Sequence, residues 1–545
     1  MAYDPAVAAC KEEIRQRSEN KTIIALAGVQ KGKNVSYIAS DTKLVEQSKI
    51  SLASEDRKDK VSSGDELYIF ESNHGSVSWA VLNCHDYSHA DLVRKLQDER
   101  IELLVVVAYN AAHKLYLEYA YADMHRLFCF IVIANIGEMG GSGVFAPFRS
   151  IGREKNARLS AGGQLFATHG TSAVDVDVPL DIGLLRSLRQ KYSEEGYTAQ
   201  VTGSEIDPIA PPQSFLKTGD GQAVGLLTAA AVRRKQLEWN SFNPQVAFCQ
   251  LDSLSMDTYL ETGYRLDGAE TPALLNSLRG KLAELEQRFA FKNPRPEVGP
   301  TVPGPDFIVF PEVYIPRDFI PDLQDFSDRN YTIVIAGMAY PKDKNVNDCL
   351  VIVPRTMRRG AKRQLIYTYR KLSRSQYDAQ RPKHKGRMQL TRGARLLRFE
   401  NSGGRRFGVL ICYDVSHFEL VHQINTDGGQ EPLDLLFVVS HNPFGDLYRY
   451  CCMADAHRFY QHIVMCNVAA YGGSGVFAPT RGPGTRRVLA EVGKGVEAIG
   501  LVKMDLTGQR NARAASEEKL HEGSFMRKPG IFQRRIVFIE SKKKD

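Results

Sequence analysis

The sequence lacks several features that mark special classes of protein. Its 545 residues contain no apolar run of the ~20 residues that a membrane-spanning helix needs. The N-terminal stretch MAYDPAVAACKEEIRQRSEN does not have the basic-then-apolar order of a secretory signal. We therefore expect a cytoplasmic protein with no membrane partner.

Cysteine is sparse and irregularly spaced. The nine cysteines are an odd number, and they show neither CxxC pairs nor the Cys/His spacing of a zinc site. This pattern predicts reduced, mostly buried thiols, without a metal or a disulfide framework. The cysteines stand at positions 10, 84, 129, 249, 349, 412, 451, 452 and 466.

Positive charge is in excess, but no nucleic-acid motif accompanies it. The net charge is +8 and the pI is about 8.8, with basic clusters in RRGAKR, RPKHKGR and the terminal SKKKD. None of these clusters is interleaved with the aromatic residues that nucleic-acid-binding motifs carry. A solvated surface explains the charge, and we expect no nucleic-acid partner.

One stretch of the sequence occurs twice. RFGVLICYDVSHFELV, from residue 406, matches VSWAVLNCHDYSHADLV, from residue 77. The match continues in LDLLFVVSHN against IELLVVVAYN and ends in GGSGVFAP, which both copies contain. The chain therefore carries two copies of one module, a duplication on the scale of a domain and not a short-period solenoid.

Strand-like and helix-like segments alternate within each copy. PQVAFCQLDSL and PDFIVFPEVYIP have the look of buried strands, and TPALLNSLRGKLAELEQRF between them has apolar residues at helical spacing. These segments precede the shared part in the second copy only. Such alternation predicts a layered α/β fold.

The copies and their flanks suggest four parts. Residues 1–180 would be a truncated domain, 181–243 a linker with a helical segment, 244–510 a complete domain and 511–545 a basic extension. The linker contains EIDPIAPPQSFLKTGDG, which is rich in Pro and Gly. We expect AVGLLTAAAVRRKQLEW, which follows it, to be helical.

Three reactive side chains follow apolar strands of the second copy. Glu312 follows DFIVF, Lys371 stands in LIYTYRKLS and Cys412 follows FGVLI. Strand ends hold side chains rigidly beside open loops, so they are common places for reactive groups. A carboxylate that takes the thiol proton and an ammonium that binds an oxyanion would complete a nucleophilic site around the cysteine.

In this order and with these flanks, the residues resemble the nitrilase or carbon–nitrogen hydrolase superfamily. The family's motifs correspond here to FPE, YRK and CYD, with GGSGVFAP downstream, over roughly residues 244–510. The resemblance implies a four-layer α-β-β-α sandwich, present as two tandem copies of which the first is incomplete.

The resemblance also implies a reaction. Cys412 would attack a non-peptide carbon–nitrogen bond and form a thioester, with Glu312 as general base. Lys371 and the backbone N–H of Tyr413 would hold the oxyanion. No metal or organic cofactor is required. Because CYD is closer to the amidase-like branches than to true nitrilases, we expect a small-molecule amide substrate.

Further residues are candidates for supporting roles. Many family members use a second acid after the lysine, and Asp378 is the candidate here. His441 and Asn442, in SHNPFGD, follow the next strand and are candidate pocket residues. A loop histidine and a turn asparagine without function remain the alternative for this pair.

The first copy retains only part of this set. It has Cys84, Lys49 in QSKISLASED, and the acidic residues Glu55 and Asp56 where Asp378 would fall. It has no counterpart of Glu312, so we expect it to be inactive or nearly so. Because family members pair their sandwiches, we expect the two copies to form an intramolecular pseudo-dimer, with further homo-oligomers also open.

Two alternatives to hydrolysis stay open. An acyltransferase would use the same thioester and resolve it with an amine. A catalytically idle scaffold or metabolite sensor would explain the degenerate first copy. The intact set of Glu312, Lys371 and Cys412 favours the hydrolase.

Overall fold

The computed structural model divides the chain into two compact units. Unit 1 comprises residues 1–190, 201–211 and 528–545, and unit 2 comprises 191–200 and 212–527. The structure describes residues 24–30, 32–39, 44–71, 77–150, 163–168, 170, 176–195, 206–208, 211–212, 231–237, 239, 242–254, 256–266, 271–289, 304–355, 365–375, 378, 390–429, 431–443, 445–481, 487–515, 524–532 and 541–544.

Unit 1 contains two main sheets. One has the order β1-β2-β3 and the other β10-β8-β7-β6-β5-β4-β25, while β9 pairs with β11. The strands are β1 (Ile24–Gln30), β2 (Lys33–Ala39), β3 (Leu44–Ser48), β4 (Leu67–Glu71), β5 (Ser78–Asn83), β6 (Leu103–Ala108), β7 (Phe130–Asn135), β8 (Gly143–Phe145), β9 (Phe148–Ser150), β10 (Gln164–Ala167), β11 (Ile206–Pro208) and β25 (Ser541–Lys544).

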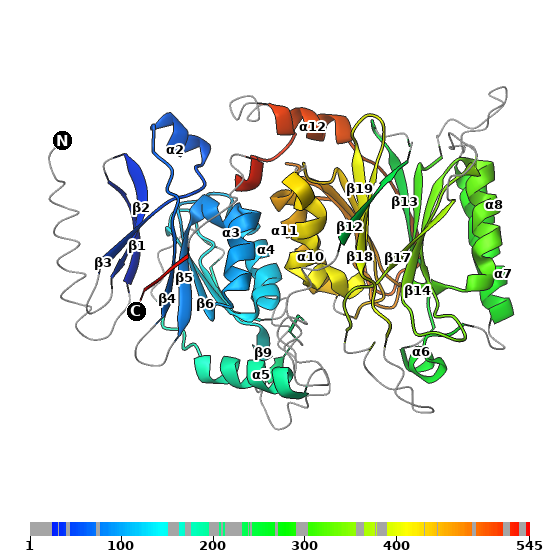
Figure 1. Ribbon diagram of the computed structural model, residues 1–545, viewed down its shortest axis with the longest axis horizontal. Helices are drawn as coiled ribbons and strands as arrows, with labels where there is room; N and C mark the ends of the chain where they lie inside the picture. The colour runs from blue at the N-terminus through cyan, green and yellow to red at the C-terminus, as the bar shows by residue number, and fades with distance from the viewer. Residues whose placement is uncertain are drawn as a thin grey trace. The chain divides into compact units, whose positions relative to one another are not determined.

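Helices cover one face of the larger sheet of unit 1. Helix α3 (Ala90–Asp98) and helix α4 (His113–Asp123) lie on the face opposite β1, β2 and β3 (Figure 1). The space between the two sheets is filled by an apolar cluster that includes Ile38, Phe70 and Trp79. Unit 1 also contains α2 (Ser54–Lys58) and the first part of α5 (Ile182–Glu195), whose residues from 191 on are assigned to unit 2.

Unit 2 contains a seven-stranded and a six-stranded sheet. Their orders are β12-β18-β19-β20-β21-β22-β23 and β17-β16-β15-β14-β13-β24. The strands are β12 (Ala231–Gln236), β13 (Gln245–Gln250), β14 (Phe307–Ile315), β15 (Ile333–Met338), β16 (Asp348–Ile352), β17 (Ile366–Arg370), β18 (Arg395–Glu400), β19 (Arg406–Ile411), β20 (Leu435–Val439), β21 (His462–Cys466), β22 (Ser474–Phe477), β23 (Val488–Val492) and β24 (Ala498–Lys503).

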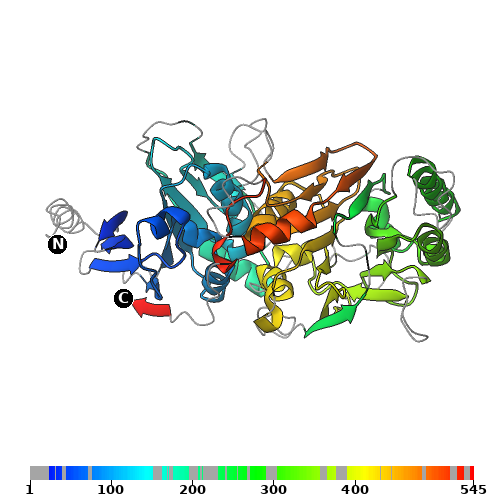
Figure 2. The ribbon, with the colours of Figure 1, turned by 90° about the horizontal axis from the view of Figure 1, so that it is seen from above.

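The two sheets of unit 2 face each other and carry helices on their outer sides. Phe307 of β14 lies with its ring centroid 5.4 Å from that of Phe407 in β19 and 5.0 Å from that of Phe437 in β20. Leu285 and Phe326 pack against the outer side of the six-stranded sheet. They belong to α7 (Thr271–Arg288) and α8 (Ile320–Asn330), the two green helices that lie side by side at the right of Figure 2.

Two further helices cover the seven-stranded sheet. They are α10 (Phe418–Thr426) and α11 (Gly445–Arg458), and Figure 1 shows both on the side away from β14 and β17. The layers of unit 2 are therefore helix, sheet, sheet and helix, which confirms the predicted α/β sandwich. The strands predicted in PQVAFCQLDSL and PDFIVFPEVYIP are β13 and β14, and the predicted helix between them is α7.

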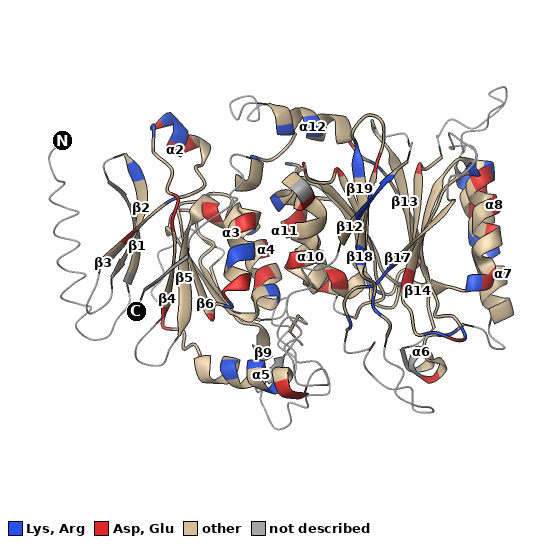
Figure 3. Cartoon of the chain, viewed as in Figure 1, with Lys and Arg blue, Asp and Glu red and all other residues tan. Residues whose placement is uncertain are grey.

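The structure corrects the predicted linker. The helix expected in AVGLLTAAAVRRKQLEW is wrong for residues 231–236, which form β12 at the edge of the seven-stranded sheet; residues 221–230 lie outside the described ones. The charges of Arg233, Arg234 and Lys235 mark this edge strand in blue in Figure 3. Charged side chains such as these are common on edge strands, because they discourage pairing with the strands of another chain.

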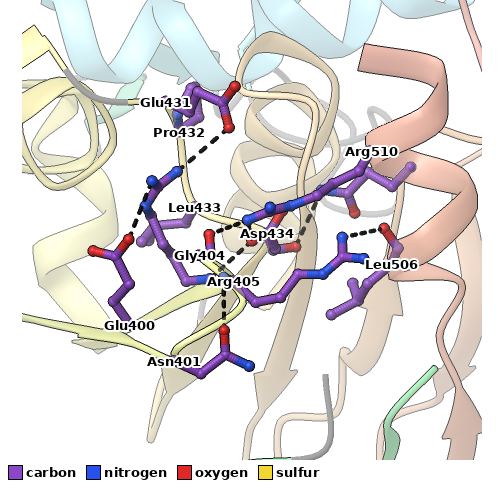
Figure 4. Close-up of polar contacts among 12 residues, drawn as sticks. Glu400, Asn401, Gly404, Arg405, Glu431, Pro432, Leu433, Asp434, Leu506 and Arg510 are labelled. Carbon is purple, nitrogen blue, oxygen red and sulfur yellow. Dashed lines mark hydrogen bonds and ion pairs between the residues drawn. The ribbon is translucent and has the colours of Figure 1, made fainter. Parts of the chain in front are cut away.

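The predicted basic extension 511–545 is also divided. Residues up to 527 belong to unit 2, whereas 528–545 belong to unit 1, where β25 pairs in parallel with β4. A buried carboxylate holds the preceding helix α12 (Leu506–Ala514) in unit 2: Asp434 accepts hydrogen bonds from Arg510 Nη2 at 2.8 Å and Arg513 Nη1 at 2.9 Å. Figure 4 shows the contact of Asp434 with Arg510, with Arg405 donating to the Leu506 carbonyl nearby.

No helix in the described ranges is both long and apolar enough to span a membrane.

Candidate active site

Glu312 lies inside the fully buried strand β14. All nine residues of β14 are buried, and pairing with β15 shifts register between Phe310 and Ile315. Val313 accordingly has a positive φ of 55°. Gly337 of β15 allows this irregular stretch to approach, since a Cβ there would lie 2.4 Å from Glu312 Cα. The bulge directs a carboxylate out of an otherwise apolar strand.

Lys371, directly after β17, joins two carboxylates. Its Nζ lies 2.9 Å from Glu312 Oε1 and 2.8 Å from Asp378 Oδ2. All three side chains are at most 5% exposed. Burial lowers the pKa of Lys371, but the charges of Asp378 and Glu312 raise it more, so the ammonium form is retained. Asp378, the predicted second acid, therefore forms an ion pair with the same ammonium group that pairs with Glu312.

Asp378 is held by three donors besides the lysine. Tyr340 Oη donates to its Oδ1 at 2.9 Å, and the backbone N–H and hydroxyl of Ser375 both donate to its Oδ2 at 2.9 Å. Burial raises the pKa of Asp378, but the charge of Lys371 and its hydrogen bond lower it by more. The net change is a decrease. Asp378 therefore remains an anion that fixes the position of the ammonium.

Glu312 has a different environment. Its Oε1 also accepts from Asn347 Nδ2 at 2.7 Å, and its Oε2 accepts from the His441 backbone N–H at 2.9 Å. Burial, helped by the charge of Asp378, raises the pKa of Glu312 in spite of Lys371. A buried carboxylate with a raised pKa takes up a proton more readily than an exposed one.

Cys412 begins the 3-10 turn η7 (Cys412–Ser416) directly after β19, with a φ of 44°. Asn442 Nδ2 lies 3.5 Å from its Sγ. Burial and then the charge of Glu312 raise the pKa of Cys412, and a hydrogen bond to Glu312 adds to this effect. The resting sulfur is therefore a thiol, and the group that it contacts is the carboxylate able to take its proton.

The structure brings the predicted pocket residues to the same place. His441 contacts Glu312 through its backbone, and Asn442 contacts Cys412 through its side chain. The His441 ring lies edge-on to Tyr259 with centroids 4.7 Å apart, and burial lowers its pKa to about 4, so the imidazole is neutral. The carbonyl of Tyr413 accepts from His417 Nδ1 at 2.9 Å, which fixes the turn after the cysteine.

Two supporting residues were missed in the sequence. Asp414 accepts from the Ser373 N–H at 2.8 Å, the Ser373 hydroxyl at 2.6 Å and the Tyr369 hydroxyl at 2.7 Å. It thereby ties the loop after Lys371 to the turn after Cys412. The second missed residue is Asn347, whose side-chain amide donates a hydrogen bond to Glu312. The acid in CYD was a visible signal for Asp414, whereas nothing near Asn347 in the sequence points to Glu312.

Unit 1 repeats part of this arrangement. Lys49 Nζ lies 2.6 Å from Asp56 Oδ2, and Asn34 Nδ2 donates to Asp56 Oδ1 at 3.0 Å. Cys84 begins the turn η1 (Cys84–Ser88) after β5, with a φ of 44°. Of the two acids predicted opposite Lys49, Asp56 is therefore the one in contact, and Glu55 accepts instead from the Ser54 hydroxyl. The described residues of unit 1 begin at 24 and include no counterpart of β14.

Comparison with family models and with curated proteins found no match. Among solved structures, the chain is similar to a CN-hydrolase superfamily protein from Xanthomonas campestris, with 13% identity, a TM-score of 0.35, and coverage of 52% of this chain and 99% of that one. It is also similar to Saccharomyces cerevisiae Nit3, a member of branch 10 of the nitrilase superfamily, at 17% identity, a TM-score of 0.34 and coverage of 52% and 99%. An amidase from Nesterenkonia sp. matches at 15% identity, a TM-score of 0.33 and coverage of 52% and 97%.

Proposed function

We propose that unit 2 is a carbon–nitrogen hydrolase of the nitrilase type that cleaves a small-molecule amide through a cysteine thioester. One observation carries the proposal: the Lys371 ammonium is buried between Glu312 and Asp378, and Glu312 also contacts the Cys412 thiol. A thiol, a proton acceptor and a fixed positive charge are thus within reach of one carbonyl group.

The first step would form the thioester. Cys412 Sγ attacks the amide carbon while its proton passes to Glu312, whose raised pKa suits it to accept one. The carbonyl oxygen becomes an oxyanion beside the Lys371 ammonium, with the backbone N–H of Tyr413 as the second donor. Glu312 then returns the proton to the leaving nitrogen, the C–N bond breaks, and ammonia or an amine departs.

The second step would use water. Glu312, again a carboxylate, takes a proton from a water molecule that attacks the thioester carbon. The C–S bond breaks and the proton returns to Cys412, so the carboxylic acid leaves and the thiol is restored. Asp378 takes no proton in this scheme, because its pKa is lowered by Lys371. Its role is to hold the ammonium in place through both steps.

Amide recognition would involve the loop after β20. Asn442 already contacts the nucleophile through its side-chain amide. His441 stays neutral and lies one residue away, with its ring against Tyr259. Neither residue is a cation that could pair with a substrate carboxylate, which favours uncharged amides.

The test is amide turnover by the full chain. Ammonia release is measured over a panel of uncharged primary amides for wild type, Cys412→Ala and Glu312→Gln, and intact mass is followed for a transient acyl adduct. Turnover lost in both variants, with the adduct on Cys412, supports the proposal. Turnover that survives Cys412→Ala contradicts it.

Two further outcomes separate the alternatives. If the acyl-enzyme on Cys412 persists in water and is discharged only when an amine acceptor is added, with saturation in that amine, the protein is an acyltransferase. If no amide or activated ester acylates Cys412, the idle scaffold is the better description.

A further inference from the structure

The turn that carries Cys84 in unit 1 is built like the turn that carries Cys412. The carboxylate of Asp86 accepts backbone hydrogen bonds from Ile50 at 3.0 Å and Ser51 at 2.5 Å. These are the two residues after Lys49, just as the residues bound by Asp414 follow Lys371. The link between the lysine loop and the cysteine turn has therefore been retained.

The ammonium beside Cys84 is also retained. Lys49 is 3% exposed and pairs with Asp56. Burial lowers the pKa of Lys49, but attraction to Cys84 and to Asp56 raises it more. Lys49 therefore stays an ammonium, a fixed positive charge that can stabilise an oxyanion forming next to it.

Cys84 differs from the other described cysteines in its access to solvent. It is partly exposed, whereas each of the other described cysteines is buried. Its Sγ lies 3.8 Å from the carbonyl oxygen of Tyr109 and 3.6 Å from Tyr116 Oη. The side chain of Tyr109 is 70% exposed, where unit 2 has the buried His441. Reagents in solution can therefore reach this thiol.

The described part of unit 1 has no counterpart of Glu312, the group that would transfer protons in unit 2. In unit 2, Asn347 holds Glu312; in unit 1, Asn34 donates to Asp56 instead. Asp56 is already paired with Lys49, which lowers its pKa against the effect of burial. Asp56 is thus poorly suited to take a proton from water or to give one to a leaving amine.

We propose that Cys84 is a second nucleophile that accepts an acyl group from an activated ester or thioester and keeps it. Its sulfur forms a bond to the acyl carbon, the bond from that carbon to the alkoxide or thiolate leaving group breaks, and the thiol proton is released to solvent. Such leaving groups need no proton from the protein. Hydrolysis of the new thioester is slow, because no described group activates water there. Unit 1 is then an acyl acceptor, and its behaviour is independent of amide hydrolysis by unit 2.

The experiment uses the full-length Cys412→Ala protein, so that unit 2 contributes no nucleophile. It is mixed with p-nitrophenyl acetate, nitrophenolate release is followed, and the product is examined by intact mass and peptide mapping. We expect one acetyl group per chain, on Cys84, at a rate at least about tenfold above that of glutathione at the same pH, because the Lys49 ammonium stabilises the oxyanion of the acyl-transfer step. The acetyl group should persist after the reagent is removed.

Variants of Lys49 test whether its ammonium accelerates acetylation of Cys84. Lys49→Met should slow acetylation by about tenfold or more, whereas Lys58→Met, at an exposed position of α2, should not. The double variant Lys49→Met/Asp56→Asn removes both buried charges and covers the case in which the single variant does not fold.

Three results would overturn the proposal. They are acetylation of Cys84 no faster than that of glutathione, a rate that does not depend on Lys49 in any folded variant, or an acetyl group that hydrolyses as fast as it forms. Because Cys412 is absent from the protein used, none of these results bears on amide hydrolysis by unit 2.

Discussion

Cys84 and Cys412 have the same left-handed backbone conformation, with a φ of 44° at both. For a residue with a side chain this conformation costs ~1–3 kcal/mol, so it persists only where the surrounding structure enforces it. In both units the enforcing contacts come from an aspartate two residues further on. Each thiol is thereby held just beyond the end of a buried strand. Cys412 contacts Glu312 there, whereas Cys84 contacts no glutamate among the described residues.

Replacing the base should abolish turnover without unfolding the protein. Glu312→Gln keeps the shape of the side chain but removes its ability to take the Cys412 proton. We expect kcat for the best amide to fall by about 10²–10⁴-fold. The matched control is Glu286→Gln. Glu286 is a partly exposed carboxylate on α7 that pairs with Arg329, so this variant should retain full activity. Steady-state ammonia release measures both, and an active Glu312→Gln enzyme would exclude the proposed base.

The pH profile should report the environment of Glu312. The base must be ionised, so kcat/KM should fall as the pH drops through the Glu312 pKa, which burial raises above 4.5. The charge of Asp378 contributes to this increase, so Asp378→Asn should move the acid limb to lower pH. Rate profiles of wild type and variant measure the shift. A limb that moves to higher pH would contradict the assignment.

Space beside the glutamate should be essential. A Cβ at Gly337 would lie 2.3 Å from the Pro311 carbonyl oxygen and 2.4 Å from Glu312 Cα, so Gly337→Ala must displace the base or its strand. We expect a loss of turnover of more than about 100-fold, since small misplacements of catalytic groups have this effect. Gly280→Ala in α7 meets nothing within 4 Å and should raise the free energy of unfolding by about 0.5–1 kcal/mol. Equal activity of the two variants would show that the contact at Gly337 does not matter.

Asp414 should matter for stability as well as for activity. The side chain is fully buried and accepts several hydrogen bonds, including those from Ser373 and Tyr369. Asp414→Asn replaces one accepting oxygen by a donor, so we expect a loss of about 2–3 kcal/mol in the free energy of unfolding. Urea denaturation measures it, with the exposed Asp325→Asn as the control that should stay within about 0.5 kcal/mol of wild type.

The contact of Asp434 with α12 should make stability depend on pH. Burial raises the pKa of Asp434, but Arg513 and Arg510 lower it more, to below its ordinary value of 3.8. A carboxylate with a lowered pKa stabilises the fold at pH values above 3.8, and this contribution is lost as the pH falls through the folded-state pKa. Asp434→Asn should therefore cost about 3–5 kcal/mol at neutral pH. Denaturation at a pH well below 3.8 should bring variant and wild type together.

Pairing of the two copies into a pseudo-dimer, and any assembly beyond it, stays a prediction from the sequence.

Much of the candidate site could be predicted because its signals are local. Glu312 and Cys412 each follow an apolar run, and the repeat drew attention to the same place in both copies. Asp378 was harder to assign, since it lies seven residues beyond Lys371 and only the folded loop brings the two together. Asn347 carried no signal, because its contact with Glu312 joins segments that are far apart in the chain.

The sequence by itself predicted two similar segments, the alternation of strands with helices and the reactive residues at strand ends, since each of these signals lies in a short stretch of chain. The tertiary structure alone decided that residues 231–236 form a strand at a sheet edge, that 528–545 belong with unit 1, and that one ammonium joins two carboxylates. Strand pairing and the burial of charge depend on partners distant in sequence. The physical reason is that a buried backbone or charged group must find a hydrogen-bond partner, and that partner exists only once the chain has folded.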